Sequence, residues 1–156
     1  MPPRLSPRAP LAILVVLAAA SVVSAVDKGK ARYMGGDIQS VPIDAEGTLA
    51  TSDGERLSFV AEAGAGAVEV RFAQMLDVTY GQNLEKGVKT LFRRKRQHLL
   101  KISYQDDPQS VAESAIMFEL GKDIVFKTLD SIEKGTGRRV LYADAEAAKF
   151  RREQQP

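Results

Sequence analysis

The sequence predicts a mainly β domain with one C-terminal amphipathic helix, an α+β fold in the form of a small barrel of about seven antiparallel strands. Short runs in which apolar and polar residues alternate, such as residues 67–72 and 99–104, are typical of half-buried antiparallel strands. An Asp-Gly pair at residues 53–54 stands between two β-forming runs and favours a tight hairpin. Only from residue 123 does the hydrophobic period become that of a helix. These three observations together define the predicted fold class.

The first predicted strands lie in the first half of the chain. Residues 33–43 predict an extended segment that a Gly-Gly pair bends, and Pro42 restricts it to a sheet edge or a strand end. Residues 48–52 and 55–60 are the two arms of the predicted hairpin. Apolar side chains on these arms are expected to pair in one layer: Leu49, Leu57 and Phe59.

The second half of the chain predicts further strands before the helix. Residues 76–80, 99–104 and 116–120 alternate in the same way, and residues 139–142 could add a last short strand. Residues 84–92 fit a helix and a strand equally well, and both readings stay open.

One amphipathic helix is predicted over residues 123–134, because three apolar side chains recur at i, i+4 and i+7 along one stripe. We expect Asp123 to be its N-cap and Gly135 to take the left-handed position after its last turn. A helix of this length can plug the open end of a small barrel, and closure of the barrel would remove exposed strand edges. The stripe consists of Val125, Leu129 and Ile132.

An apolar, uncharged run at residues 11–25 follows two basic side chains, Arg4 and Arg8. A basic start, an apolar centre and small residues at its end are the layout of a secretory signal peptide, so we predict cleavage after Ala25. The alternative is an uncleaved anchor over residues 11–26, although a spanning helix needs roughly 20 strongly apolar residues. The sequence therefore predicts an exported protein, periplasmic or extracellular, with a membrane-tethered form as the alternative.

The charge balance changes if this segment is removed. The chain has 22 basic and 20 acidic side chains, and the excess equals the two arginines of the segment. The cleaved protein is therefore expected to be neutral, without the overall positive charge that attracts nucleic acid. With no cysteine in the chain, an exported domain of this kind must rely on a packed core instead of disulfides.

The predicted organisation is one domain between a removable start and a polar end. Residues 1–25 are the predicted signal peptide, residues 26–31 a flexible lead-in, residues 32–142 the barrel domain and residues 143–156 a polar tail that is helical or frayed.

A basic cluster is the most distinctive charge pattern in the chain, since residues 86–101 contain no acidic side chain. At the tip of a loop between strands, such a cluster could bind an acidic envelope protein, an anionic glycan or a lipid head group. The alternative is a solvated turn that discourages strand aggregation. The predicted binding residues are Arg93, Arg94, Lys95, Arg96 and His98.

Residue patterns for catalysis and metal binding are weak. His98 is the only histidine and cysteine is absent, so the usual zinc ligand sets cannot be built. No Gly-x-Ser-x-Gly motif accompanies His98, which we expect to be a polar residue at a strand edge. Asp106 and Asp107 fit a turn before Pro108 better than a calcium loop. We therefore expect no enzymatic activity, no cofactor and no metal.

Several motifs resemble the pleckstrin-homology-like and GRAM-type domains, in which a strand, a hairpin and a further strand lead to a short segment that opens the next strand. The later strands and the helix from Asp123 look like the remaining strands and capping helix of that fold, and small secreted bacterial proteins of unknown function share it. The resemblance covers residues 31–142. It is carried by residues 47–51 (GTLAT), 57–60 (LSFV), 68–70 (VEV), 75–81 (MLDVTYG), 95–104 and 114–120.

The resemblance implies binding of a membrane, a peptide or a protein partner. Phosphoinositide binding is not implied, because members that bind lipid act in the cytoplasm and this chain carries an export signal. We expect an exported, non-enzymatic binding or scaffolding domain of the bacterial cell envelope, which binds through the basic loop and a groove between the helix and the barrel edge. The alternative is an envelope structural protein tethered by an uncleaved N-terminal helix.

Overall fold

The computed structural model describes residues 28–154 apart from residues 52, 83–96, 108 and 110. The described residues form a single sheet of eight strands in the order β4-β3-β2-β1-β7-β6-β5-β8, together with helices α1 and α2. This confirms the predicted class, mainly β with a C-terminal helix, with one strand more than expected. The strands are β1 Gly29–Gly36, β2 Glu46–Ala50, β3 Arg56–Ala61, β4 Ala67–Arg71, β5 Met75–Gly81, β6 His98–Tyr104, β7 Ser114–Leu120 and β8 Leu141–Tyr142.

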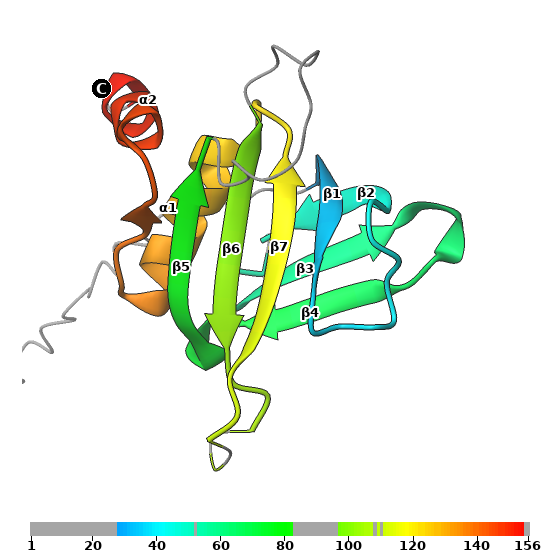
Figure 1. The fold of residues 1–156 in the computed structure, drawn as a ribbon. Coiled ribbons are helices and arrows are strands. Elements are labelled where there is room, and N and C mark those ends of the chain that lie inside the picture. The colour runs from blue at the N-terminus through cyan, green and yellow to red at the C-terminus, as the bar shows by residue number, and fades with distance from the viewer. Residues whose placement is uncertain (1–27, 52, 83–96, 108, 110, 155–156) are drawn as a thin grey trace, which may run out of the picture.

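The sheet is built from two antiparallel meanders joined by β1 and β7. Strands β1 to β4 follow one another, as do β5 to β7, and Tyr33 of β1 lies opposite Phe118 of β7 at the junction. Figure 1 shows the two meanders at an angle to each other. Strands β4 and β5 are consecutive in the chain, yet they are not neighbours in the sheet. The sheet is therefore a curled half-barrel, not the closed barrel that the sequence suggested.

The predicted hairpin forms at Asp53 and Gly54. One carboxylate oxygen of Asp53 accepts hydrogen bonds from the backbone amides of Glu55 and Arg56, each 3.0 Å long. Gly54 has a φ of 69°, a conformation that glycine adopts without strain. The two arms then pair in register as β2 and β3, and their expected apolar layer is fully buried: Leu49, Leu57 and Phe59.

Strand β1 begins earlier than the predicted lead-in allows. The sequence placed residues 26–31 outside the domain, but Gly29 and Ala31 are buried in β1. A Cβ atom on Gly29 would overlap the side chain of Ile124, so the start of β1 lies directly against the residue that precedes α1. The charges of residues 28–30 masked this buried alternation in the sequence.

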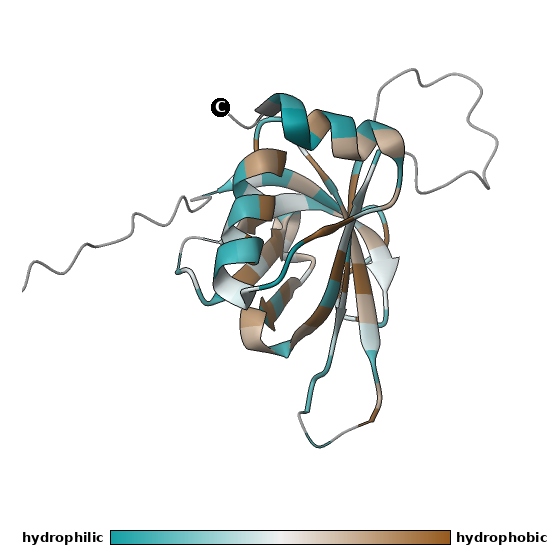
Figure 2. Ribbon diagram, turned by 90° about the vertical axis from the view of Figure 1, so that its left-hand side faces the viewer, coloured by the Kyte–Doolittle hydropathy of each residue, from teal (hydrophilic) through white to brown (hydrophobic). Residues whose placement is uncertain are grey.

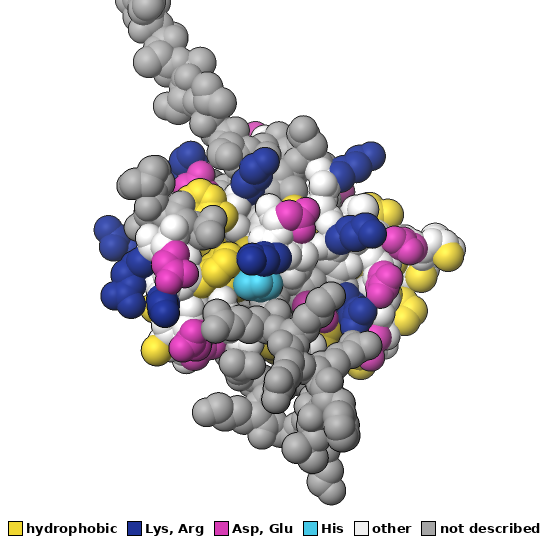
Figure 3. All heavy atoms as spheres, turned by 90° about the horizontal axis from the view of Figure 1, so that it is seen from above, with side chains coloured by type: hydrophobic (Ala, Val, Ile, Leu, Met, Phe, Trp, Pro, Cys, Tyr) yellow, Lys and Arg dark blue, Asp and Glu magenta, His cyan; other side chains and the backbone are white. Residues whose placement is uncertain are grey.

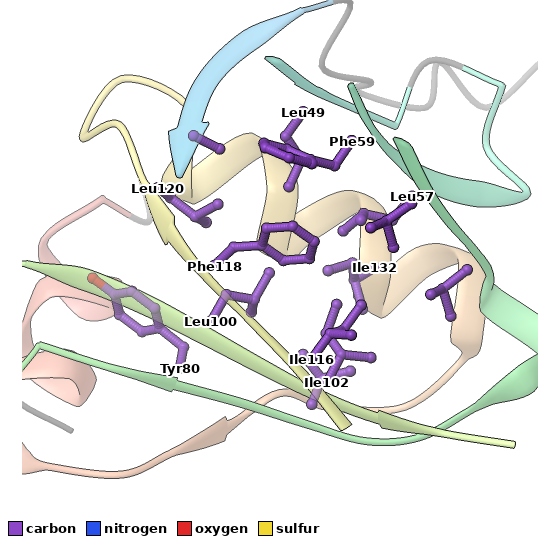
Figure 4. Close-up of a cluster of buried hydrophobic side chains, with 14 of the residues drawn as sticks. Leu49, Leu57, Phe59, Tyr80, Leu100, Ile102, Ile116, Phe118, Leu120 and Ile132 are labelled. Atoms are coloured by element: carbon purple, nitrogen blue, oxygen red, sulfur yellow. The ribbon is translucent and has the colours of Figure 1, made fainter. Parts of the chain in front are cut away.

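The core fills the concave side of the curled sheet. Phe118 lies at its centre, and Figure 4 shows it between side chains of β2, β3 and β6 and the helix behind them. Its ring centroid is 5.2 Å from that of Phe59 and 5.8 Å from that of Tyr33, distances at which aromatic rings attract one another. Residues from both meanders thus meet in one core.

Helix α1, Val125–Thr136, covers this core with the predicted stripe, of which Val125, Leu129 and Ile132 are all buried. Its caps differ from the prediction, because Ile124 precedes the helix and Gly137 takes the left-handed position with a φ of 67°. Gly135 stays inside the last turn, where a Cβ atom would overlap the ring of Phe72. Close packing of the helix on this ring therefore explains Gly135.

The end of the chain is helical, which was one of the two predicted forms, but it packs on the domain instead of forming a tail. Strand β8 pairs in parallel with the edge strand β5, with Thr79 opposite Leu141 and Tyr80 opposite Tyr142. Helix α2, Ala145–Gln154, follows it, and its Ala147 is fully buried. Figure 2 shows α1 alongside the curled sheet and α2 across its upper end. Together α1, β8 and α2 form one side of the domain, next to β5.

Candidate functional site

A buried aromatic and polar cluster lies where β5 and β6 meet α2. The Tyr80 hydroxyl is 2.6 Å from His98 Nδ1, and the planes of the two rings differ by 8°. Gln82 Nε2 donates a 3.3 Å hydrogen bond to the same hydroxyl. Either group can be the donor in the Tyr80–His98 hydrogen bond, because the phenol both donates and accepts and the role of Nδ1 depends on the imidazole tautomer. Phe150 of α2 covers the pair, with its ring centroid 5.1 Å from that of His98.

Asp144 connects this cluster to α2. One of its carboxylate oxygens accepts a 2.8 Å hydrogen bond from the backbone amide of Gln82, and the other accepts a 2.7 Å bond from that of Ala147. The second contact caps the first turn of α2. Burial raises the pKa of the Tyr80 phenol to about 12; the Asp144 charge adds to this effect, while the Gln82 hydrogen bond opposes it. In Figure 4 the Tyr80 hydroxyl points away from the apolar core residues.

A second group of charged side chains, Arg151 and Glu133, lies next to Tyr142. Arg151 of α2 is only 8% exposed, and its Nη2 donates a 2.8 Å hydrogen bond to Oε2 of Glu133 on α1. Its guanidinium carbon lies 4.5 Å from the centroid of the Phe126 ring, a cation–π contact. The other oxygen of Glu133 accepts a 3.0 Å hydrogen bond from the backbone amide of Val140. One carboxylate thus holds the chain before β8 and the helix after it.

Arg151 also has an unused donor. Its Nη1 atom is buried and has no hydrogen-bond partner, and a guanidinium nitrogen without a partner in a buried place costs free energy. Arg151 lines a cavity of about 460 Å³, which we call the Arg151 hollow. Its lining consists of Glu133, Arg139, Val140, Tyr142 and Arg151.

The Arg151 hollow is positively charged and has hydrogen-bond donors. Glu133 compensates one of the two arginines that line it, and none of the other described residues forms an ion pair with Arg139. Burial raises the pKa of the Tyr142 hydroxyl, and the charge of Glu133 adds to this effect, while the charge of Arg151 and a hydrogen bond with its side chain oppose it. Tyr142 is therefore neutral near pH 7 and can donate a hydrogen bond. This arrangement can hold one negative charge next to an apolar surface.

The groove between helix and barrel edge that the sequence suggested is largely filled. Nη1 of Arg138 donates to the backbone carbonyls of Met75 and Leu76, so this side chain crosses the groove. A cavity of only about 50 Å³ stays between α1 and β5. The open space lies farther along the same side, at the Arg151 hollow.

Another hollow, of about 310 Å³, lies at the start of β1 and β2. Its central cation, Arg32, is 2.9 Å from a carboxylate oxygen of Glu46 and 3.7 Å from one of Glu119. These ion pairs balance the charge of Arg32 within the hollow itself. This hollow therefore gives less evidence of a ligand than the unpartnered Nη1 of Arg151 does.

Of the five predicted binding residues, only His98 belongs to the part of the chain that the structure describes. Arg93, Arg94, Lys95 and Arg96 lie outside the described residues, so the predicted basic loop stays a prediction. His98 is described, and it is 6% exposed with its ring bonded to Tyr80. Figure 3 looks down on this end of the molecule and shows acidic and basic side chains interspersed around the histidine.

The remaining sequence candidates lie apart from this site. Asp107 accepts a 2.9 Å hydrogen bond from the backbone amide of Gln109, as in a turn. Glu119 belongs to the ion pairs of Arg32 described above. Within the described ranges, no three histidine or carboxylate side chains gather closely enough to hold a metal ion. Neither helix among the described residues is long and apolar enough to cross a membrane.

Sequence reasoning missed Glu133 and Arg151 as a pair. A signal was present in α2, because Ala147, Phe150 and Arg151 follow the i, i+3, i+4 spacing of one helix face. An arginine on such a face indicates that its charge has a partner when the face is buried. The partner could not be read from the sequence, since Glu133 is 18 residues away.

Comparisons with known proteins identify no family for this chain. No family model matches it, and no curated protein matches it. Nine chains of solved structures match, among them the Vps36 N-terminal PH domain. That match has 13% sequence identity and a TM-score of 0.40, and it covers 73% of this chain and 82% of the other. What this chain binds must be inferred from its own residues.

Replacing Glu133 with Gln should destabilise the protein by about 1–3 kcal/mol, because a buried guanidinium loses its charged partner while the acceptor for Val140 is kept. Urea unfolding followed by circular dichroism measures this cost. Glu153→Gln is the matched control, since Glu153 and its partner Lys149 are both more than 60% exposed and 3.9 Å apart. Equal effects of the two substitutions would contradict a structural role for the Glu133–Arg151 pair.

Tyr80 should make the domain less stable as the pH rises from about 10 to 12. An unfolded tyrosine has a pKa of about 10, whereas the pKa of Tyr80 in the folded protein is about 12. The unfolded chain therefore releases this proton first, and stability is lost as the pH rises through that window. The free energy of unfolding is measured by urea unfolding at several pH values between about 8 and 11.5 for the wild type and for Tyr80→Phe. It should decline less steeply with pH for the variant. Parallel declines would refute this assignment.

Proposed function

We propose that this chain is an exported, non-enzymatic binding domain of the bacterial cell envelope, of the pleckstrin-homology-like type. Its binding site is the Arg151 hollow between α1, β8 and α2. The observation that supports this most is the buried Nη1 of Arg151, a charged donor without a partner beside a cavity of about 460 Å³. A donor held in place before the ligand arrives reduces the cost of binding.

The framework of the hollow supports a binding role as well. Glu133 fixes Arg151 from one side and Phe126 supports it from the other, so the guanidinium cannot easily change its direction. Arg139 is exposed and can approach a ligand from the solvent side. A rigid buried charge together with an adjustable exposed one is suited to holding a small negatively charged group.

The basic loop is a second surface within the same proposal. Arg93 to Arg96 would attract an acidic envelope protein, an anionic glycan or a lipid head group through their charge, and this attraction would weaken with salt. His98 belongs to this proposal only by its position in the sequence, since its described contacts are with Tyr80 and Phe150. The two surfaces make different predictions for variants.

A capture experiment separates the two surfaces. The purified protein is immobilised and incubated with envelope extract, and bound material is compared for the wild type, Arg139→Gln and a variant with Ser at residues 93–96. A component lost with Arg139→Gln but kept with Arg152→Gln, a matched change of an exposed arginine outside the hollow, would support the Arg151 hollow. Loss only with the variant of residues 93–96 would transfer the function to the loop. Binding unaffected by every variant would reject both surfaces.

Export is tested independently of binding. Protein recovered from the periplasm or the medium should begin at Val26 when its N-terminus is sequenced, because the predicted cleavage follows Ala25. A fraction that stays in the membrane and keeps residues 11–25 would instead establish the alternative, an envelope structural protein tethered by its N-terminal helix. Retention in the cytoplasm would reject both forms of the proposal.

A further inference from the structure

We propose that the Arg151 hollow recognises the carboxylate of a small organic acid. This inference rests on the proposed function and names the class of ligand that the hollow takes. It follows from three properties of the hollow: the number of donors, the net charge and the size.

The donors suit a planar anion with two acceptor oxygens. Nη2 of Arg151 is occupied by Glu133 at 2.8 Å, while Nη1 is buried without a partner, so a ligand that displaces the packing over Nη1 gains an unused charged donor. The hydroxyl of Tyr142 and the guanidinium of Arg139 line the same cavity. Two oxygens of one carboxylate can be shared among these groups.

The net charge favours a single negative charge over two. Arg139 and Arg151 contribute two positive charges to the lining, and Glu133 removes one of them. A carboxylate would make the hollow neutral. A phosphate dianion would leave one excess negative charge close to Glu133, and like charges at short range repel each other.

The size and the apolar part of the lining indicate a body beyond the carboxylate. A cavity of about 460 Å³ falls within the usual range for small-molecule sites, which is roughly 300–1,000 Å³. A carboxylate group alone would fill only a small part of it. Val140 and the ring of Tyr142 offer apolar surface for the rest of the ligand. An acid with a body beyond its carboxylate therefore fills the hollow better than acetate or a bare inorganic ion.

Sodium benzoate is the probe for this proposal, and benzamide is its neutral counterpart of the same shape. The purified protein is titrated with each, and with inorganic phosphate, while the side-chain N–H resonances of Arg139 and Arg151 and the backbone amides of Val140 and Tyr142 are followed by NMR. We expect saturable shifts of these resonances with benzoate only. Equal shifts with benzamide, stronger binding of phosphate, or no saturable shift with benzoate would overturn the proposal.

Variants locate the binding. Arg151→Lys keeps a charge for Glu133 but lacks the second terminal nitrogen, and it should weaken benzoate binding about tenfold or more, as expected for a lost charged hydrogen bond. Tyr142→Phe should weaken it by about two- to tenfold, and Arg139→Gln by about two- to fivefold. Arg152→Gln should leave the affinity unchanged. An Arg152→Gln effect as large as that of Arg139→Gln would show unspecific attraction to charge and overturn the proposal.

The folded state of each variant is checked by its circular dichroism spectrum and thermal unfolding. Tyr142→Phe and Arg139→Gln leave the Glu133–Arg151 pair intact, so they test the hollow even if Arg151→Lys fails to fold. The titration also stands apart from the capture experiment. Failure of benzoate together with capture that depends on Arg139 would reject the carboxylate ligand and keep the binding function.

Discussion

The missing pairing between β4 and β5 is the constraint on which the rest of the structure depends. A closed barrel would cover its own core, but this sheet curls only partly and leaves its concave side open. Helix α1 fills that side, and its last turn must approach Phe72 so closely that position 135 cannot carry a Cβ atom. The core residues of both meanders are therefore buried only when the helix is in place, so the sheet and α1 depend on each other.

The same constraint explains the unusual end of the chain. Because β5 is left as an edge strand, the segment after α1 returns to it as the short parallel strand β8. Edge strands that stay uncovered can pair with other molecules, and a covering strand prevents this. The return also brings Arg151 back to Glu133, so the charged hollow is a product of the path by which the chain covers the edge of its sheet. The candidate site and the path of the chain thus both depend on the open edge of β5.

The sequence predicted the local elements well and the long-range contacts poorly. The Asp-Gly hairpin, the alternating strands and the stripe of α1 depend on neighbouring residues, and the structure has each of them. The N-cap at Asp123 and the end at Gly135 were wrong, since Ile124 precedes the helix and Gly137 ends it, while Gly135 packs against Phe72 inside the last turn. Closure of the barrel depends on strands far apart in the chain, and no local pattern reports whether β4 meets β5.

For the candidate site, too, the sequence predicted local segments and missed long-range contacts. Arg139 and Tyr142 lie in a segment that the sequence identified as a short strand, and the side of the domain near α1 was identified as a binding surface. The role of Arg151 was missed, because the polar composition of residues 143–156 suggested a polar tail, helical or frayed. Composition describes the whole segment, whereas burial concerns only the one face that carries Ala147, Phe150 and Arg151.

The two oxygens of Glu133 connect parts of the chain that are made at different times. During synthesis α1 leaves the ribosome first, then Val140, and Arg151 after it, so this carboxylate gains its second partner 18 residues after Glu133 itself has been made. The Asp144 cap has the same property, because it joins the end of β5 to the first turn of α2. The contacts that fix α2 on the domain therefore form only after the residues of the sheet and of α1 have been made.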